Sequence, residues 1–278
     1  MCPIEQFSGD GRRLALTGPE SGWHESTHAG LWLDKYLRAL NPTGDDDKSA
    51  IRELIREVGK TAVPLGYARA LTAREAILRT LDGGVEGGRT RVFAARTRGR
   101  VVVGLGTESL RETNITLQHT WGVPVVPGSA LKGLASSTAH TAGGPPWQRA
   151  EVDRPGGEDH RLLFGDTEWK GYVTFHDAWW LPPEEPTLQL DLDIMTVHHA
   201  GYYRDGREVP ADWDDPNPVA FATATGAFLV ALSGPLAWVD RAEEWLRLGL
   251  EQHGVGGKTR AGYGRMSLDP RLSAQEQE

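Results

Sequence analysis

The sequence predicts an α+β protein in which a helical amino-terminal third precedes a region of strands and two helices. Three observations support this prediction. The first third contains helix start and stop signals. Two glycine pairs at 83–84 and 87–88 then mark a change of pattern. Beyond them, β-prone runs alternate with two helical segments. We therefore expect a helical extension over 1–88 and a second domain over 89–278.

In the extension, capping residues predict where the helices begin and end. Thr72 and Glu75 have the spacing of a capping box, Thr27 is a suitable first cap, and Gly59 is a stop signal. The expected helices are 27–40, 48–58 and 72–81.

The second domain has the element order of a split βαβ, or ferredoxin-like, arrangement. Asp240 and Glu243 form a second capping box, and Gly254 is a typical helix stop. Residues 142–170 contain Gly-Pro-rich stretches and are expected to form an irregular insertion. The expected strands are 92–95, 101–105, 173–175, 187–197, 219–232 and 263–268. The expected helices are 130–141 and 241–253.

Composition indicates a soluble globular protein. Of the 278 residues, 39% are hydrophobic and 24% are charged. No apolar run has membrane-spanning length, and the first residues lack the pattern of a signal peptide. The single cysteine, Cys2, cannot form an internal disulfide or a zinc site. We expect a cytoplasmic protein without a membrane partner.

The charge distribution is uneven. A net charge of −8 argues against indiscriminate nucleic-acid binding, which depends on neutralising phosphates. One stretch, 89–100, contains five arginines and no acidic residue. This stretch predicts either a local basic groove on an acidic body or an ordinary solvated face.

Two glycine-rich segments, 121–133 and 254–264, each combine glycines with a lysine and a hydroxyl residue. Such a backbone can wrap closely around phosphates. In the first, Ser129 is the expected cap of the helix that follows, with Lys132 in its first turn. The unpaired amides of that helix start would favour an anion.

The second segment is not a nucleotide-binding P-loop, although it contains Gly257-Lys258-Thr259. The first glycine of that motif should stand at position 252, where this chain has glutamine. The segment is also expected to follow a helix and enter a strand, the reverse of the P-loop order.

The order and spacing of five segments resemble the RAMP superfamily of CRISPR-associated RNA-binding proteins. Within it they are similar to sixth subunits of the type III-B (Cmr) effector complex. The residues that match are 122–133, 164–178, 195–203, 216–221 and 254–264, within a region from about 101 to 268. The chain departs from the pattern at Ala130, where a second serine is usual, and at Met266, where an aromatic residue is common.

The resemblance implies a ferredoxin-like, RRM-like RAMP core and a non-catalytic RNA-binding subunit in antiviral defence. Its partners would be crRNA, target RNA and other Cmr subunits, at a place near the 3′ end of the guide. No cofactor and no metal are expected. The residues expected to contact RNA are Gly128, Ser129, Lys132, Gly133, His198, His199, Gly256, Gly257, Lys258, Thr259, Arg260 and Tyr263.

Other chemistry has weaker support. His198 or His199 could act as a general acid or base in RNA cleavage, but the sequence places no second such group beside them. Asp191 and Asp193 should share one face of a strand, where they could hold a divalent metal or face solvent. The alternative functions are a guide-processing endoribonuclease of the same superfamily, the equivalent end-capping subunit of a type III-A complex, and a protein-binding scaffold.

The aromatic residues divide into two groups. Trp121 and Tyr263 lie within the glycine-rich segments, where they could stack on a nucleotide. Trp179, Trp180 and the tryptophans of the last helix are expected in the core or at a subunit interface.

Overall fold

The structure is a computed structural model that describes residues 23–37, 45–84, 87–109, 113–151, 155–183, 189–197 and 217–269. The helices are α2 (Ala29–Lys35), α3 (Asp45–Gly59), α4 (Tyr67–Thr80), α5 (Gly128–Ala142), α6 (Glu158–Phe164) and α8 (Leu236–Gln252). Two short 3₁₀ helices are η1 (Pro145–Trp147) and η2 (Thr259–Ala261). The strands are β1 (Gly88–Thr97), β2 (Val125–Val126), β3 (Thr174–Phe175), β4 (Ala178–Leu181), β5 (Leu190–Val197), β6 (Asn217–Ala224), β7 (Ala227–Pro235) and β8 (Met266–Asp269).

The main sheet has the topology of a ferredoxin-like core. Its strand order is β2-β4-β7-β1-β8, β3 also pairs with β7, and every pairing is antiparallel. Along the chain the core runs β1, α5, β4, β7, α8, β8, which is the split βαβ order. The predicted fold class is confirmed.

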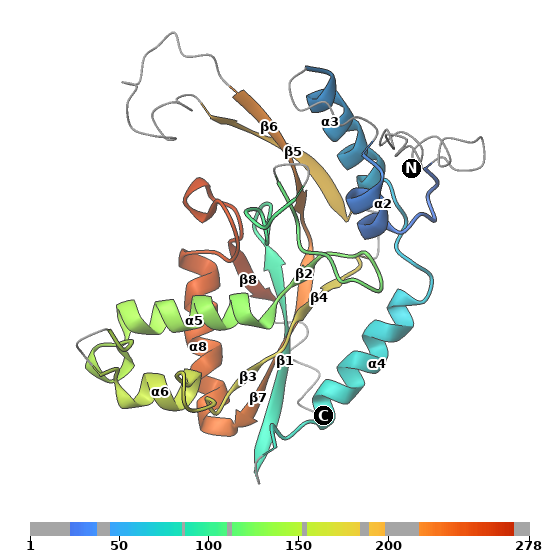
Figure 1. Cartoon of the computed structure of the whole chain (residues 1–278). Coiled ribbons are helices and arrows are strands. Elements are labelled where there is room, and N and C mark those ends of the chain that lie inside the picture. The colour runs from blue at the N-terminus through green and yellow to red at the C-terminus, as the bar shows by residue number, and fades with distance from the viewer. Residues whose placement is uncertain are drawn as a thin grey trace, which may run out of the picture.

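The central strand β7 is buried along almost its whole length because helices cover both faces of the sheet. Figure 1 shows α5 and α8 on one side and α4 on the other. Phe228 and Val230 belong to the main core, whereas Leu229 and Ala231 pack with Leu78 of α4. The alternation of a strand thus supplies both faces with apolar side chains.

A close approach fixes α8 against α5. The core side of α8 carries Val239, Ala242, Leu246 and Leu250 at helical spacing, all fully buried. A Cβ on Gly249 would lie 2.6 Å from Thr138 Oγ1 of α5, so only a glycine permits this crossing.

A second, two-stranded sheet extends from the core (Figure 1). Strands β5 and β6 pair from Leu190–Ala224 to Val197–Asn217, and α3 packs against both of them. An isolated bridge between Val101 and Ala224 connects this hairpin to the chain after β1. None of the described helices is long and apolar enough to span a membrane.

The helix over 48–58 is confirmed within α3, but the two other amino-terminal helices begin at different residues from those predicted. Helix α4 begins at Tyr67 after Gly66, so Thr72 lies inside it and donates to the Ala68 carbonyl. Helix α2 is capped by His28, whose Nδ1 accepts from the Leu31 amide. The prediction for 27–40 also included residues 38–40, which lie outside the described part of the chain.

The start of α8 was also predicted wrongly. The helix follows Pro235 at the end of β7, five residues earlier than the Asp240–Glu243 box suggested. Asp240 instead forms an ion pair with Arg91 of β1, 2.9 Å from Nη2 to Oδ1. Local capping rules failed because a tertiary partner was available for the carboxylate.

Four predicted strand or loop boundaries need correction. The run 219–232 is two strands, β6 and β7, separated by a turn at Gly226 with φ +109°. Residues 101–105 form turns and one bridge in place of a strand. Within 142–170, expected to be irregular, the chain forms η1 and α6. The last strand starts at Met266, three residues later than predicted.

Candidate nucleic-acid interface

The amino end of α5 is occupied by a carboxylate of the chain itself. The helix begins at Gly128, whose N–H donates to Asp177 Oδ1 at 2.7 Å. Ser129 is therefore the second helical residue and not the cap. Arg74 donates to the Asp177 carbonyl at 2.9 Å, and its guanidinium lies 4.6 Å from the ring centroid of Trp179. The anion preference of the helix end is thus met within the chain.

Gly128 also permits a close approach of α5 to the sheet. A Cβ at this position would lie 2.1 Å from the Phe175 carbonyl oxygen. The exposed residues at the start of α5 are Ser129, Lys132 and Gly133. Four residues of this segment were predicted to contact RNA. Three of them are exposed to solvent, whereas Gly128 is buried.

The second glycine-rich segment is a loop closed by backbone hydrogen bonds. Val255 N–H donates to the Gly264 carbonyl at 2.9 Å, which closes the loop on itself. Gly257 N–H donates to the Val102 carbonyl at 2.7 Å, and Gly264 N–H to the Arg100 carbonyl at 2.8 Å. The loop is therefore held against the chain that follows β1.

Two of its glycines are required by contacts within the protein. A Cβ on Gly264, where φ is +73°, would lie 1.9 Å from the Val255 carbonyl oxygen. A Cβ on Gly256, where φ is +91°, would lie 2.2 Å from the Val102 carbonyl oxygen. Gly262 has φ +94° but open space around it. At Gly262, the positive φ is therefore the reason that glycine is favoured.

Lys258 is unusual within this loop. Its φ of +57° makes it the one non-glycine residue with positive φ in the described part of the chain. Its side chain and that of Arg260 are exposed, and Thr259 between them is half-buried. The tip of the loop therefore displays two cations on a rigid backbone.

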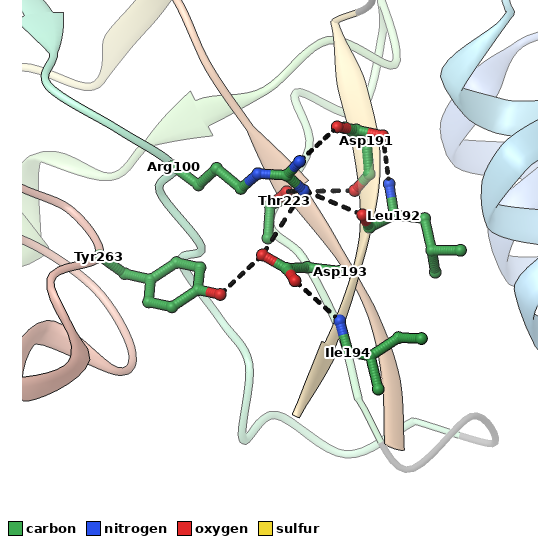
Figure 2. Close-up of polar contacts among 7 residues, drawn as sticks. All are labelled: Arg100, Asp191, Leu192, Asp193, Ile194, Thr223 and Tyr263. Atoms are coloured by element: carbon green, nitrogen blue, oxygen red, sulfur yellow. Dashed lines mark hydrogen bonds and ion pairs between the residues drawn. The ribbon is translucent and has the colours of Figure 1, made fainter. Parts of the chain in front are cut away.

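Tyr263 connects the loop to the β5–β6 hairpin. Its hydroxyl donates to Asp193 Oδ2 at 2.6 Å, and its ring lies 5.8 Å from that of Phe221. Figure 2 shows the aspartate between this hydroxyl and the guanidinium of Arg100. Burial first, and then the hydrogen bond to Asp193, raise the pKa of Tyr263 to about 12. The hydroxyl therefore remains a donor at neutral pH.

Arg100 is the centre of this network. It forms an ion pair with Asp191 at 2.8 Å and a longer one with Asp193 at 3.5 Å. Its Nη1 donates to the Leu192 carbonyl at 2.9 Å and approaches Thr223 Oγ1 at 3.4 Å. Asp191 and Asp193 share one face of β5, as predicted, and the cation beside them is this arginine. No cluster of three or more His, Cys, Asp or Glu suited to a metal occurs among the described residues.

A second polar cluster lies between α5 and α6. Ser136 Oγ is 2.9 Å from His160 Nε2 and accepts from Arg149 Nε at 3.0 Å. Arg149 Nη2 also donates to the Gly133 carbonyl at 3.2 Å. Burial, followed by the charges of Arg149, His140 and Lys132, lowers the pKa of His160 to about 4. The imidazole is therefore neutral at pH 7, and its Nε2 lies within hydrogen-bond distance of the Ser136 hydroxyl.

Comparison with known proteins identifies the family. Residues 94–267 match the RAMP superfamily. The chain belongs to the RAMP superfamily. It is 31% identical over 225 residues to the CRISPR system Cmr subunit Cmr6 of Pyrococcus furiosus, a match that covers 62% of this chain and 66% of the relative. The chain thus spans just under two thirds of that relative's length.

One solved structure supports the fold. A chain of the cryo-EM structure of the Type III-B Cmr-beta bound to cognate target RNA matches with a TM-score of 0.62. That match is 20% identical and covers 84% of this chain and 77% of the other. A crystal structure of Cmr6 from Pyrococcus furiosus matches at 29% identity over 66% of this chain and 99% of that one, with a TM-score of 0.42.

The residues predicted from the RAMP motifs lie in more than one part of the fold. The two glycine-rich segments belong to neighbouring helices, since the second follows α8, which packs against α5. Trp121 is half-buried, with its ring 6.0 Å from that of Tyr67. His198 and His199 lie outside the described residues. Their contact with RNA stays a prediction.

The five arginines of the basic stretch 89–100 lie in different environments. Arg91 and Arg100 form ion pairs with acids of α8 and β5. Arg89, Arg96 and Arg98 are exposed.

Sequence reasoning missed Asp177 as the partner of α5 and Arg149 as a neighbour of Lys132. Asp177 stands 49 positions from Gly128, and Arg149 lies 16 positions from Gly133. No local motif marks either pairing.

We predict that two glycines of the loop respond differently to alanine. Gly264→Ala should lower the free energy of unfolding by at least about 2 kcal/mol, because both the positive φ and the Val255 carbonyl oppose a Cβ. Gly262→Ala should cost only about 1 kcal/mol, since its neighbourhood is open. Denaturant unfolding of both variants measures the difference. Equal losses would contradict the closure described for Gly264.

We predict that Asp193 and Tyr263 are energetically coupled. A double-mutant cycle with Asp193→Asn and Tyr263→Phe should give a coupling of about 1 kcal/mol, as expected for a charge-assisted hydrogen bond that is partly exposed. Ultraviolet titration of tyrosine should also show the pKa of Tyr263 falling towards its ordinary value in Asp193→Asn. Additive effects and an unchanged titration would show that this contact is unimportant.

We predict that His160 makes stability depend on pH. Between its ordinary pKa of 6.5 and its folded value of about 4, the unfolded chain binds a proton that the folded chain does not. The free energy of unfolding should therefore fall by up to about 3 kcal/mol as the pH drops from 6.5 to 4. His160→Gln should remove part of this loss. Burial lowers the pKa of His176 as well, so some dependence should remain. A profile that His160→Gln does not flatten would contradict the assignment.

Proposed function

We propose that this chain is a non-catalytic subunit that binds guide RNA in a type III-B CRISPR effector complex, near the 3′ end of the guide. Its partners are crRNA, target RNA and other Cmr subunits. Support for this proposal comes from membership of the RAMP superfamily and from similarity to the Cmr6 of Pyrococcus furiosus. The match covers 66% of that relative, so the assignment of these partners to this chain is part of the proposal.

The observation that carries the proposal is the conformation of Lys258. A non-glycine residue at φ +57° costs about 1 kcal/mol, and the same loop uses glycine at four other positive-φ positions. A glycine would relieve that cost, but it would also remove the side chain. We infer that position 258 holds a lysine, despite the backbone cost, because its exposed ammonium group has a role in binding.

The chemistry of the loop suits a ligand with phosphates and no fixed base sequence. Lys258 and Arg260 present charges, and Lys132 presents another at the start of α5. Contacts of this kind position a nucleic acid without reading its bases. A guide whose sequence varies requires that tolerance. The net charge of −8 opposes RNA elsewhere on the chain, so neighbouring subunits must contribute to affinity.

The one hydroxyl that lies beside a histidine in the α5–α6 cluster is poorly placed to act as a nucleophile. Ser136 is 8% exposed, its oxygen accepts from Arg149 Nε, and the pKa of the histidine beside it is lowered. Such a histidine is a weak base. The alternative of a guide-processing endoribonuclease depends on His198 and His199. Single-turnover cleavage of a repeat RNA that either His198→Ala or His199→Ala abolishes would establish that alternative.

A type III-A end-capping subunit would use the same contacts. The test is assembly: the chain should co-purify with type III-B partners and not with those of a type III-A complex. A stable assembly that lacks RNA would favour a protein-binding scaffold.

We predict opposite effects of one substitution on RNA binding and on stability. Lys258→Asn should weaken binding of single-stranded RNA roughly three- to tenfold, because one phosphate contact is lost. It should leave the free energy of unfolding unchanged or raise it by a few tenths of a kcal/mol, since asparagine tolerates the left-handed region. Fluorescence titration with unrelated RNA sequences and denaturant unfolding measure the two effects.

Lys258→Arg is the matched control, because it keeps the charge at the same backbone geometry. It should retain most of the affinity. If Lys258→Asn bound RNA as tightly as the parent chain, the Lys258 ammonium group would have no role in binding. The proposed function would then lose the argument on which it rests.

A further inference from the structure

We propose that Arg149 is an additional RNA-phosphate ligand that acts beside Lys132 on the outer side of α5. The inference rests on the proposed function, because it extends the same RNA-binding surface. It assigns a role to a residue of the 142–157 segment, which links α5 to α6, contains η1 and lies outside both glycine-rich segments.

The position of Arg149 is set by neutral acceptors. Its Nε donates to Ser136 Oγ and its Nη2 to the Gly133 carbonyl, so the guanidinium lies along the first half of α5. Its own backbone N–H donates to His140 Nδ1 at 3.1 Å. These three contacts hold the guanidinium next to the residue that follows Lys132 in the sequence.

The charge of Arg149 is not neutralised by the described residues. Within the described ranges no carboxylate forms an ion pair with it, although ion pairs hold Arg79, Arg91, Arg100 and Arg241. An arginine has five N–H donors, and the side-chain bonds above use two. The half-buried guanidinium therefore keeps three donors and its full charge for a ligand.

The surroundings of His160 support a positive local potential. Besides burial, the charges of Arg149 and Lys132 lower its pKa. Two cationic side chains thus lie near the same part of α5. A phosphate is the ligand that matches a fixed guanidinium with a lysine nearby.

Arg149 also joins the 142–157 segment to α5, so a purely structural role must be separated from ligand binding. The two roles differ in their dependence on salt. For single-stranded nucleic acid, each phosphate contact contributes about 0.7 to the slope of log affinity against log salt. A residue that acts only as a clamp changes stability and leaves this slope intact.

The experiment measures binding of a single-stranded RNA of arbitrary sequence to the full chain over a range of salt concentrations. Arg149→Met should lower the slope by about 0.7 and weaken binding several-fold at low salt. Arg149→Lys, which keeps the charge but cannot make both fixed bonds, should recover most of the slope. Arg79→Met removes an arginine from α4 on the opposite side of the sheet and should leave the slope unchanged.

Each outcome decides the question. An unchanged slope in Arg149→Met, with or without a lower melting temperature, overturns the proposal and leaves a structural clamp. An unchanged slope with weaker assembly into the complex assigns Arg149 to an acidic protein partner instead, which also overturns it. If Lys258→Asn loses affinity while Arg149→Met does not, only this inference fails. If the parent chain shows no salt-dependent RNA binding, the proposed function fails with it.

Discussion

Arg100 is the residue on which the arrangement of the proposed RNA-binding loop depends. Its carbonyl accepts from Gly264 N–H, and its guanidinium pairs with Asp191 and approaches Asp193. Asp193 in turn accepts from the Tyr263 hydroxyl (Figure 2). One residue thus joins the end of β1, the loop after α8 and the β5–β6 hairpin. Backbone hydrogen bonds between Val101 and Ala224 and from Gly257 to Val102 join the same three parts.

The strength of this junction comes from the number of contacts and not from any single one. The Arg100 side chain is 36% exposed and that of Asp191 46%, so solvent screens their attraction. The backbone bonds from Gly257 to Val102 and from Gly264 to Arg100 are independent of that charge. A loop held by both kinds of contact can be rigid without a large contribution from each. Rigidity lowers the entropy lost when a ligand binds.

The sequence predicted the order of elements well and their boundaries less well, for a physical reason. Helix α3 follows local rules, and its predicted range lies within the observed one. The starts of α5 and α8 did not follow them, because Asp177 satisfies Gly128 and Arg91 attracts Asp240. Both partners lie in distant parts of the chain. Local capping rules contain no information about such partners.

The candidate site shows the same division. The glycine and lysine pattern of 254–264 predicted a tight loop, and the structure has one. It could not predict that Gly256 faces a protein carbonyl, since that carbonyl belongs to Val102, more than 150 positions away. The paired acids of β5 were predicted to share a face, but their partner Arg100 was grouped with a basic stretch. The sequence pattern identified the charged residues. Tertiary contacts determine which of them pair within the chain and which can bind a ligand.

An acidic protein can bind RNA only where its cations lack internal acidic partners, and this chain separates the two kinds clearly. Arg79, Arg91, Arg100 and Arg241 each pair with a carboxylate and stabilise the fold. Lys132, Arg149, Lys258 and Arg260 form no ion pair within the described ranges, and they belong to α5, the segment after it and the loop after α8. Helices α5 and α8, which carry or precede these residues, pack together on one side of the sheet (Figure 1). Binding that depends on so few charges is sensitive to salt, which makes assembly with partner subunits a physical requirement for holding RNA.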